Sequence, residues 1–118
     1  MTVRIRNITR GTELGDSITV AVTSQTRRTG LLKHTGLDKG HGLWIKPCES
    51  IHTFFMKFPI DVVYVDRKMK VKKVVPAIPA WRMSGCLTAH SVIELPVGVI
   101  EQSGTVRGDE LTVETVQG

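Results

Sequence analysis

The chain has 118 residues, of which 41% are hydrophobic and 23% are charged, and its formal net charge is +5. This length predicts a single domain over residues 1–118, since compact domains cluster at roughly 100–150 residues. No stretch approaches the ~20 apolar residues of a membrane-spanning helix, and the N-terminus lacks the apolar run of a signal peptide, so we expect a cytoplasmic protein with no membrane partner.

Short strands separated by turns account for most of the first half of the chain. Residues 3–8 alternate polar and apolar side chains, which is typical of a half-buried strand. A turn over residues 11–16 leads into a strand of β-branched residues at 18–22. Ser24 is placed to cap a helix that continues to Lys33, and the three glycines within residues 36–42 predict a loop.

The second half continues this pattern. Apolar stretches predict strands at residues 43–45, 51–58, 61–65, 71–75, 90–95 and 111–114. Residues 66–69 form a turn, whereas Pro76 and Pro79 predict an irregular segment because proline cannot donate to a sheet ladder. A short helix could run from Pro96 to Gln102. Seven or so strands with one or two short helices predict a mainly β fold, either a small β-barrel-like structure or a two-sheet sandwich.

The segment from Pro47 to Asp61 carries the most unusual chemistry. If residues 51–58 form a strand, His52 and Met56 share one face with two phenylalanines. An apolar face with few polar groups is typical of a small-ligand site, beside which Trp81 could form a lid. The candidate ligand-binding residues, including polar ones from later segments, are His52, Phe54, Met56, Asp61, Arg82 and Glu94.

Two segments repeat a Cys-x-x-x-His spacing, in which Cys48 precedes His52 and Cys86 precedes His90. Together these side chains could hold a tetrahedral zinc ion, but neither half has the tight Cys-x-x-Cys spacing typical of zinc sites. We therefore interpret all four as core or pocket residues and expect no cofactor. The cysteines are expected to be thiols in a reducing cytoplasm, while a Cys48–Cys86 disulfide stays open.

The excess of positive charge is partly local. Residues 67–73 carry five cations and no anion. A basic hairpin tip could attract nucleic acid, but no aromatic residues interleave with these cations for base stacking. The favoured interpretation is a solvated edge that prevents aggregation, and nothing in the sequence decides the oligomeric state.

Three classes of function stay open. The favoured one is a domain that binds a small molecule or a peptide end through a pocket around His52, Met56 and Glu94. The second is a metal-assisted or cysteine-dependent hydrolytic enzyme that uses His52, Asp61 and Cys48, because a thiolate nucleophile needs a nearby base. The third is an interaction module whose basic hairpin contacts an acidic partner.

Several motifs occur in the order found in one known family. They are Gly30-Leu31-Leu32, Gly42-Leu43-Trp44-Ile45, the His-Thr-x-x-Met-x-x-Pro-Ile-Asp pattern from His52 to Asp61, Val92-Ile93-Glu94-Leu95-Pro96-Val97-Gly98 and Gly108-Asp109. The chain therefore resembles the domain-of-unknown-function family numbered 192 over residues 28–113. The resemblance implies a compact β-barrel-like or sandwich fold with a short helix or two, and no activity. Its motif residues His52, Met56, Asp61 and Glu94 coincide with candidate ligand-binding residues.

Overall fold

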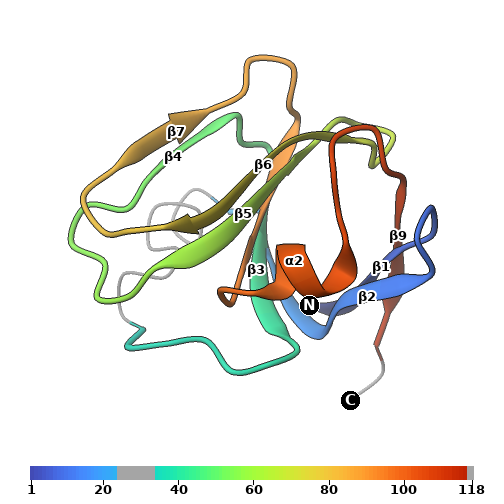
Figure 1. Ribbon diagram of the computed structural model, residues 1–118, viewed down its shortest axis with the longest axis horizontal. Helices are drawn as coiled ribbons and strands as arrows, with labels where there is room; N and C mark the ends of the chain where they lie inside the picture. Colours follow the sequence, from blue (N-terminus) through green and yellow to red (C-terminus); the bar gives the residue numbers. More distant parts are fainter. Residues whose placement is uncertain (24–33, 117–118) are drawn as a thin grey trace.

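The computed structural model describes residues 1–23 and 34–116. Nine strands and one helix lie within these residues (Figure 1). They are β1 (Thr2–Asn7), β2 (Thr12–Ala21), β3 (His41–Ile45), β4 (Ser50–His52), β5 (Ile60–Val65), β6 (Val71–Ile78), β7 (Met83–Gly85), β8 (Ser91–Leu95), α2 (Val99–Ser103) and β9 (Leu111–Thr115). No helix in this part of the chain is long and apolar enough to cross a membrane.

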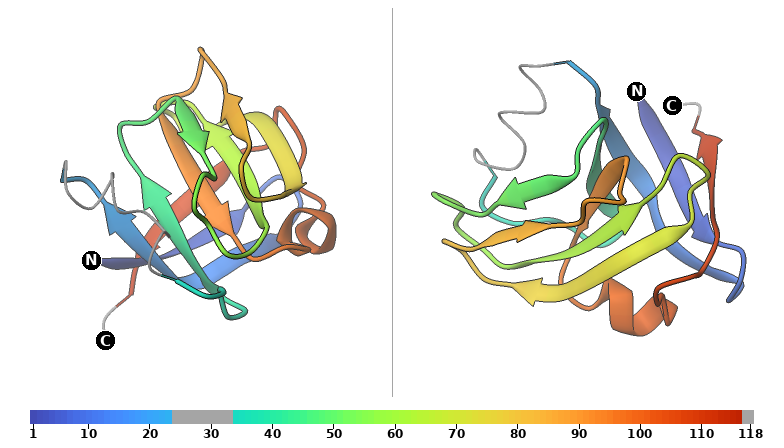
Figure 2. Two further views of the ribbon diagram at one scale, coloured as in Figure 1. Left: turned by 90° about the vertical axis from the view of Figure 1, so that its left-hand side faces the viewer. Right: turned by 90° about the horizontal axis from the view of Figure 1, so that it is seen from above.

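Seven strands form one curled sheet in the order β6-β5-β8-β3-β2-β1-β9, and β4 pairs with β7 in a separate small sheet. The pair β2–β3 is parallel, and the other neighbouring strands are antiparallel. The two edges of the large sheet meet where Lys70 bridges Glu110 and the Leu111 N–H donates to the Met69 carbonyl over 2.9 Å. The sheet is thus a half-barrel with α2 beside one end (Figure 2), which confirms the predicted mainly β, barrel-like fold.

Two clusters of buried side chains pack on the two faces of this sheet. The barrel core fills the inside of the curl and includes Val63 and Val65. The outer core packs between the other face and the β4–β7 sheet, and it includes Val62 and Tyr64. Because side chains alternate along a strand, β5 and β8 are buried on both faces, which explains their almost continuously apolar sequences.

The strand expected over residues 51–58 is wrong beyond residue 52. β4 ends at His52, and Phe55 has a φ of 66°, a left-handed conformation outside the region of regular strands. The alternation that was expected to place His52 and Met56 on one face therefore does not hold. In the structure Met56 is buried in the outer core while His52 is exposed.

Other boundaries also differ from the expectation. The turn expected over residues 11–16 is misplaced, since it lies over residues 8–11 and β2 begins at Thr12. β6 continues through Pro76, which an edge strand tolerates because the missing N–H needs no partner there. β7 has only three residues and therefore gives no periodic signal. The helix expected over residues 24–33 lies outside the described residues.

Candidate ligand-binding site

Four aromatic rings form a row of contacts on the surface beside the small sheet. The ring centroid of His52 lies 5.0 Å from that of Phe54, Phe54 lies 5.9 Å from Trp81, and Trp81 lies 4.6 Å from Phe55. His52 ends β4, and Phe54 and Phe55 lie in the loop that follows it. Trp81 lies in the segment before β7. We call these four residues the aromatic platform.

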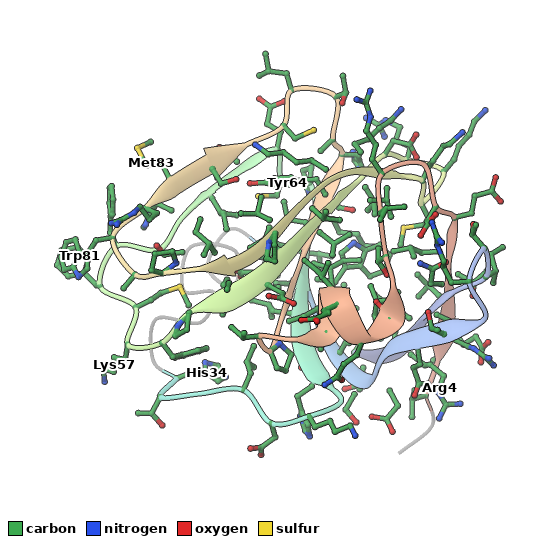
Figure 3. The ribbon with its side chains drawn as sticks, in the orientation of Figure 1. Arg4, His34, Lys57, Tyr64, Trp81 and Met83 are labelled. Carbon is green, nitrogen blue, oxygen red and sulfur yellow. The ribbon has the colours of Figure 1, made fainter. Side chains whose placement is uncertain are left out.

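The platform is open to solvent. Phe55 exposes 69% of its surface and Trp81 exposes 55%, and the neighbouring Met83 exposes 77%. Figure 3 shows Trp81, Met83 and Lys57 projecting from the same side of the molecule. Large apolar side chains that gather on an exposed surface, rather than being scattered singly, mark binding sites.

The backbone of the platform is strained at two positions. Phe55 and Trp81 have φ values of 66° and 64°, in the left-handed region that residues other than glycine rarely adopt. Each such conformation costs roughly 1–2 kcal/mol. Because both side chains are exposed, burial of the rings does not compensate for this cost. Strain of this kind is concentrated at functional sites, where the surrounding structure holds it in place.

Thr53 is the residue that holds the two segments of the platform together. Its backbone N–H donates to the Arg82 carbonyl over 2.8 Å, and its carbonyl accepts from the Trp81 N–H over 3.0 Å. The buried Thr53 hydroxyl donates to the Pro79 carbonyl over 2.7 Å and accepts from the Arg82 N–H over 2.9 Å. Four hydrogen bonds from one residue therefore fix residues 79–82 against the loop that follows β4.

The charged groups in the platform segments are all of one sign. Residues 50–59 and 79–83 contain Lys57, Arg82 and the titratable His52, and they contain no aspartate or glutamate. Lys57 and Arg82 are exposed, and the Arg82 Nη1 stays close to the ring-bearing loop, 3.4 Å from the Trp81 carbonyl. The local field therefore favours an anionic group beside the rings.

Glu94 lies in the outer core instead of at the platform surface. It is 4% exposed and pairs across the sheet with Leu43 and Val62. Burial raises the pKa of its carboxyl group to about 7, and no described residue donates a hydrogen bond to it. Nearby on the same face, burial also raises the pKa of Tyr64, whose hydroxyl donates to Ser84 over 3.0 Å.

The side chain of Asp61 lies on the opposite face of the sheet from that of Glu94. Asp61 pairs with Leu95, one position along from the Val62–Glu94 pair, so the side chains of Asp61 and Glu94 lie on opposite faces of the sheet. The Asp61 carboxylate accepts three backbone N–H groups, from Ala77 over 2.8 Å, Gly98 over 3.1 Å and Ile100 over 2.9 Å. We call this arrangement the Asp61 junction, because it ties the end of β6 to the start of α2.

The two Cys-x-x-x-His segments lie side by side, joined by a hydrogen bond from the Cys48 N–H to the His90 carbonyl over 2.8 Å. The Cys48 thiol donates to the Ser50 carbonyl over 3.0 Å, and the Cys86 thiol lies 3.4 Å from the Thr88 hydroxyl. The two thiols are separate and do not form a disulfide. Within residues 1–23 and 34–116, no three His, Cys, Asp or Glu side chains are grouped so that they could hold a metal ion.

The structure thus divides the six candidate residues among three places. His52, Phe54 and Arg82 meet at the platform, Met56 and Glu94 lie in the outer core, and Asp61 forms its own junction. Phe55 and the role of Thr53 were not predicted from the sequence, and Trp81, which was expected to form a lid, is a ring of the platform. The consecutive aromatic residues Phe54 and Phe55, which a strand would point to opposite faces, were the available signal that the strand ends early.

Comparison with known proteins identifies the family. The DUF192 family, described as "Uncharacterized ACR, COG1430", matches residues 6–113. The chain belongs to the DUF192 family. A UPF0127 protein of Thermococcus sibiricus is 33% identical to it over an alignment of 117 residues, which covers 92% of this chain and 73% of the relative. In this DUF192 chain, the motif from His52 to Asp61 supplies three platform rings and the carboxylate of the Asp61 junction.

Two solved structures share the fold of this DUF192 chain. One is a Sinorhizobium meliloti protein whose name gives it a provisional role as a transcription regulator, with a TM-score of 0.80 and 20% identity over 94% of this chain and 91% of that one. The other is a protein of unknown function from Novosphingobium aromaticivorans, with a TM-score of 0.79 and 18% identity over 95% of this chain and 84% of that one. At these identities the likeness shows the fold alone.

Proposed function

We propose that this DUF192 chain is a binding domain that takes the C-terminal end of a peptide on its aromatic platform. The observation that carries the proposal is the exposed row of rings, in which Phe55 and Trp81 hold a left-handed backbone while remaining open to solvent. A fold that needed these residues only for packing would bury them or place glycine there.

The open shape supports a peptide over a small molecule. Small ligands are held in concave sites that bury roughly 70–90% of their surface. Phe55, Trp81 and Met83 are instead each more than half exposed. An extended peptide can lay an apolar or aromatic side chain across these rings, and aromatic contacts of this kind contribute about 0.5–1.5 kcal/mol beyond the area that they bury.

The charge supports a terminal carboxylate as the second point of contact. Arg82 presents a planar guanidinium that can bind a carboxylate through two parallel hydrogen bonds. Lys57 adds a second cation, and no carboxylate of residues 50–59 or 79–83 competes for either group. The outer core beneath, with Met56 and Glu94, supports the loop and does not contribute a contact surface in this proposal.

Isothermal titration calorimetry with two matched peptides tests the proposal. The peptides are N-acetyl-Leu-Phe with a free carboxylate and the same peptide as its amide. We expect the free acid to bind about tenfold more tightly, which corresponds to about 1.4 kcal/mol. The substitution Arg82→Gln should bring the acid down to the affinity of the amide without changing the binding of the amide.

A control variant outside the platform distinguishes binding at the platform from nonspecific hydrophobic binding. Trp81→Ala should abolish binding of both peptides, because it removes the central ring. Leu87→Ala removes an apolar side chain that is 89% exposed and lies outside the platform, so it should leave both affinities unchanged. Equal losses in Trp81→Ala and Leu87→Ala would contradict the proposal.

The hydrolytic enzyme and the basic interaction module stay predictions, as does the small-molecule form of the binding function. The predicted cytoplasmic location also stays a prediction, and fractionation of the native host cell would test it.

A further inference from the structure

We propose a second binding site, independent of the platform, in a cleft at the mouth of the half-barrel, and we infer that it takes a small molecule carrying a carboxylate or phosphate group on an apolar body. The cleft has a volume of about 540 Å³. It opens between the start of β8, the turn that joins β5 to β6, and β9. This turn lies on the side of the molecule away from Trp81 (Figures 1 and 3).

The floor of the cleft is apolar and belongs to the barrel core. Trp44 and Leu111 are buried members of that core, and Met69 and Val113 pack against it from the rim. An apolar floor of this kind accepts a hydrocarbon or aromatic body. Since these side chains are fixed by the surrounding strands, the site is preformed.

The rim of the cleft is basic. Lys46, Arg67, Lys68 and His90 line it, and Asp66 is the one carboxylate among the lining residues. The Asp66 carboxylate is already occupied by its own turn, since it accepts the N–H groups of Lys68 over 2.9 Å and of Lys70 over 3.0 Å. It also pairs with the Lys72 Nζ at 3.7 Å. The rim therefore presents three permanent cations to a ligand against one anion that is occupied elsewhere.

Two details indicate where the anionic group would lie. The Lys46 Nζ sits 4.0 Å from the centroid of the Trp44 ring, which holds this cation over the floor. The Ser91 hydroxyl, which is 1% exposed, accepts from the Trp44 Nε1 over 2.9 Å. Its own proton has no acceptor among the described residues, so this O–H is left to donate to a group in the cleft.

The size of the cleft favours a small ligand over nucleic acid. Pockets for small molecules have volumes of roughly 300–1,000 Å³, a range that includes this one. Single-stranded nucleic acid needs exposed aromatic rings on which successive bases stack. The aromatic residue of this cleft, Trp44, is buried, and its ring is covered by Lys46.

Titration of the full chain with three related probes tests the inference. Phenyl phosphate and phenylacetate carry the two kinds of anionic group, and benzyl alcohol has a similar ring without charge. We expect one or both anions to shift the NMR signal of the Trp44 indole N–H and to bind at least about tenfold more tightly than benzyl alcohol. The anion that binds more tightly indicates whether the site prefers a phosphate or a carboxylate group. The indole signal of Trp81, the second of the two tryptophans, reports separately on binding at the platform.

Matched charge variants locate the site. The double variant Arg67→Gln/Lys68→Gln should weaken anion binding at least about tenfold, whereas Lys39→Gln/Arg107→Gln, which removes the same charge from exposed positions outside the cleft, should change it less than twofold. An unmoved Trp44 signal, equal binding of benzyl alcohol, or equal losses in the two double variants would overturn the inference. Displacement of phenyl phosphate by a single-stranded oligonucleotide that binds more tightly would also overturn it, because the surface would then serve a polyanion.

Discussion

One short motif supplies three rings of the aromatic platform and the carboxylate of the Asp61 junction, but the two places differ in how they expose their side chains. At the junction a buried carboxylate accepts three backbone N–H groups, from Ala77, Gly98 and Ile100. At the platform, apolar rings stay in water on a backbone that is strained at Phe55 and Trp81. Neighbouring residues of one motif therefore have different roles. The hydrogen bonds of the junction stabilise the fold, whereas the strained backbone of the platform destabilises it.

The largest expected effect comes from breaking the junction. Asp61→Ala leaves three backbone N–H groups without their acceptor, that of Ile100 in a buried bond and those of Ala77 and Gly98 in partly buried ones. Hydrogen bonds to charged groups contribute roughly 1.5–3 kcal/mol each. We expect the free energy of unfolding, measured in urea, to fall by about 4 kcal/mol. Asp66→Ala is the matched control, because Asp66 also accepts two backbone N–H groups but does so in an exposed turn, and its loss should be clearly smaller. Similar losses for the two variants would contradict the role given to the junction.

A smaller effect is expected from the buried carboxyl group of Glu94. Its folded-state pKa of about 7 lies above the ordinary value of 4.5, so the protonated form is favoured by folding. The stability that this protonation provides is complete below the unfolded pKa and is lost as pH rises through about 7. We expect the wild type to lose about 2–3 kcal/mol of unfolding free energy between pH 5 and pH 9 through this group.

Glu94→Gln provides the control for this pH dependence. Glutamine stays neutral, so the variant should lack the loss that Glu94 causes, and its unfolding free energy should exceed that of the wild type at pH 9. Urea denaturation at several pH values measures both slopes. If the two proteins show the same slope between pH 5 and pH 9, the carboxyl group of Glu94 does not titrate as the structure indicates.

The smallest effect is the most informative about the platform. Phe55→Gly relieves a left-handed strain of about 1–2 kcal/mol, against the extra 0.5–1 kcal/mol that glycine costs on folding, so stability should stay unchanged or rise by up to about 1 kcal/mol. Met83→Gly, at an equally exposed position of β7 with an ordinary φ, should lose stability instead. Thermal unfolding compares the two. A clear loss in Phe55→Gly would show that its ring stabilises the fold.

The sequence predicted the barrel better than the platform for a physical reason. β5 and β8 are mainly apolar, apart from Asp61, Ser91 and Glu94, and Gly104 ends α2 with a φ of 70°, so local patterns are sufficient there. The platform instead depends on hydrogen bonds between Thr53 and residues 79–82, which lie 26–29 positions away. No periodicity in a short window records such a contact.

The grouping of the candidate site residues also depends on contacts that the sequence does not predict. Asp61 and Glu94 were grouped in one site because both are acidic and both lie in apolar strands. Their separation depends on register, since Asp61 pairs with Leu95 while Glu94 pairs with Val62, and a shift of one residue exchanges the faces of a sheet. The rings of His52 and Phe54 do contact each other, although the strand that was expected to align them ends at His52.

The most direct test of the platform is an NMR titration that follows the two tryptophan indole N–H signals as N-acetyl-Leu-Phe is added. Trp81 lies in the platform and Trp44 in the barrel core, so each signal reports on one place. The proposed function predicts a saturable shift of the Trp81 signal, whether or not the peptide also occupies the cleft beside Trp44, and loss of that shift in Phe55→Gly although that variant stays folded. A Trp81 signal that does not move at millimolar peptide, or that moves equally with the Phe55 ring removed, would contradict the platform as the binding site.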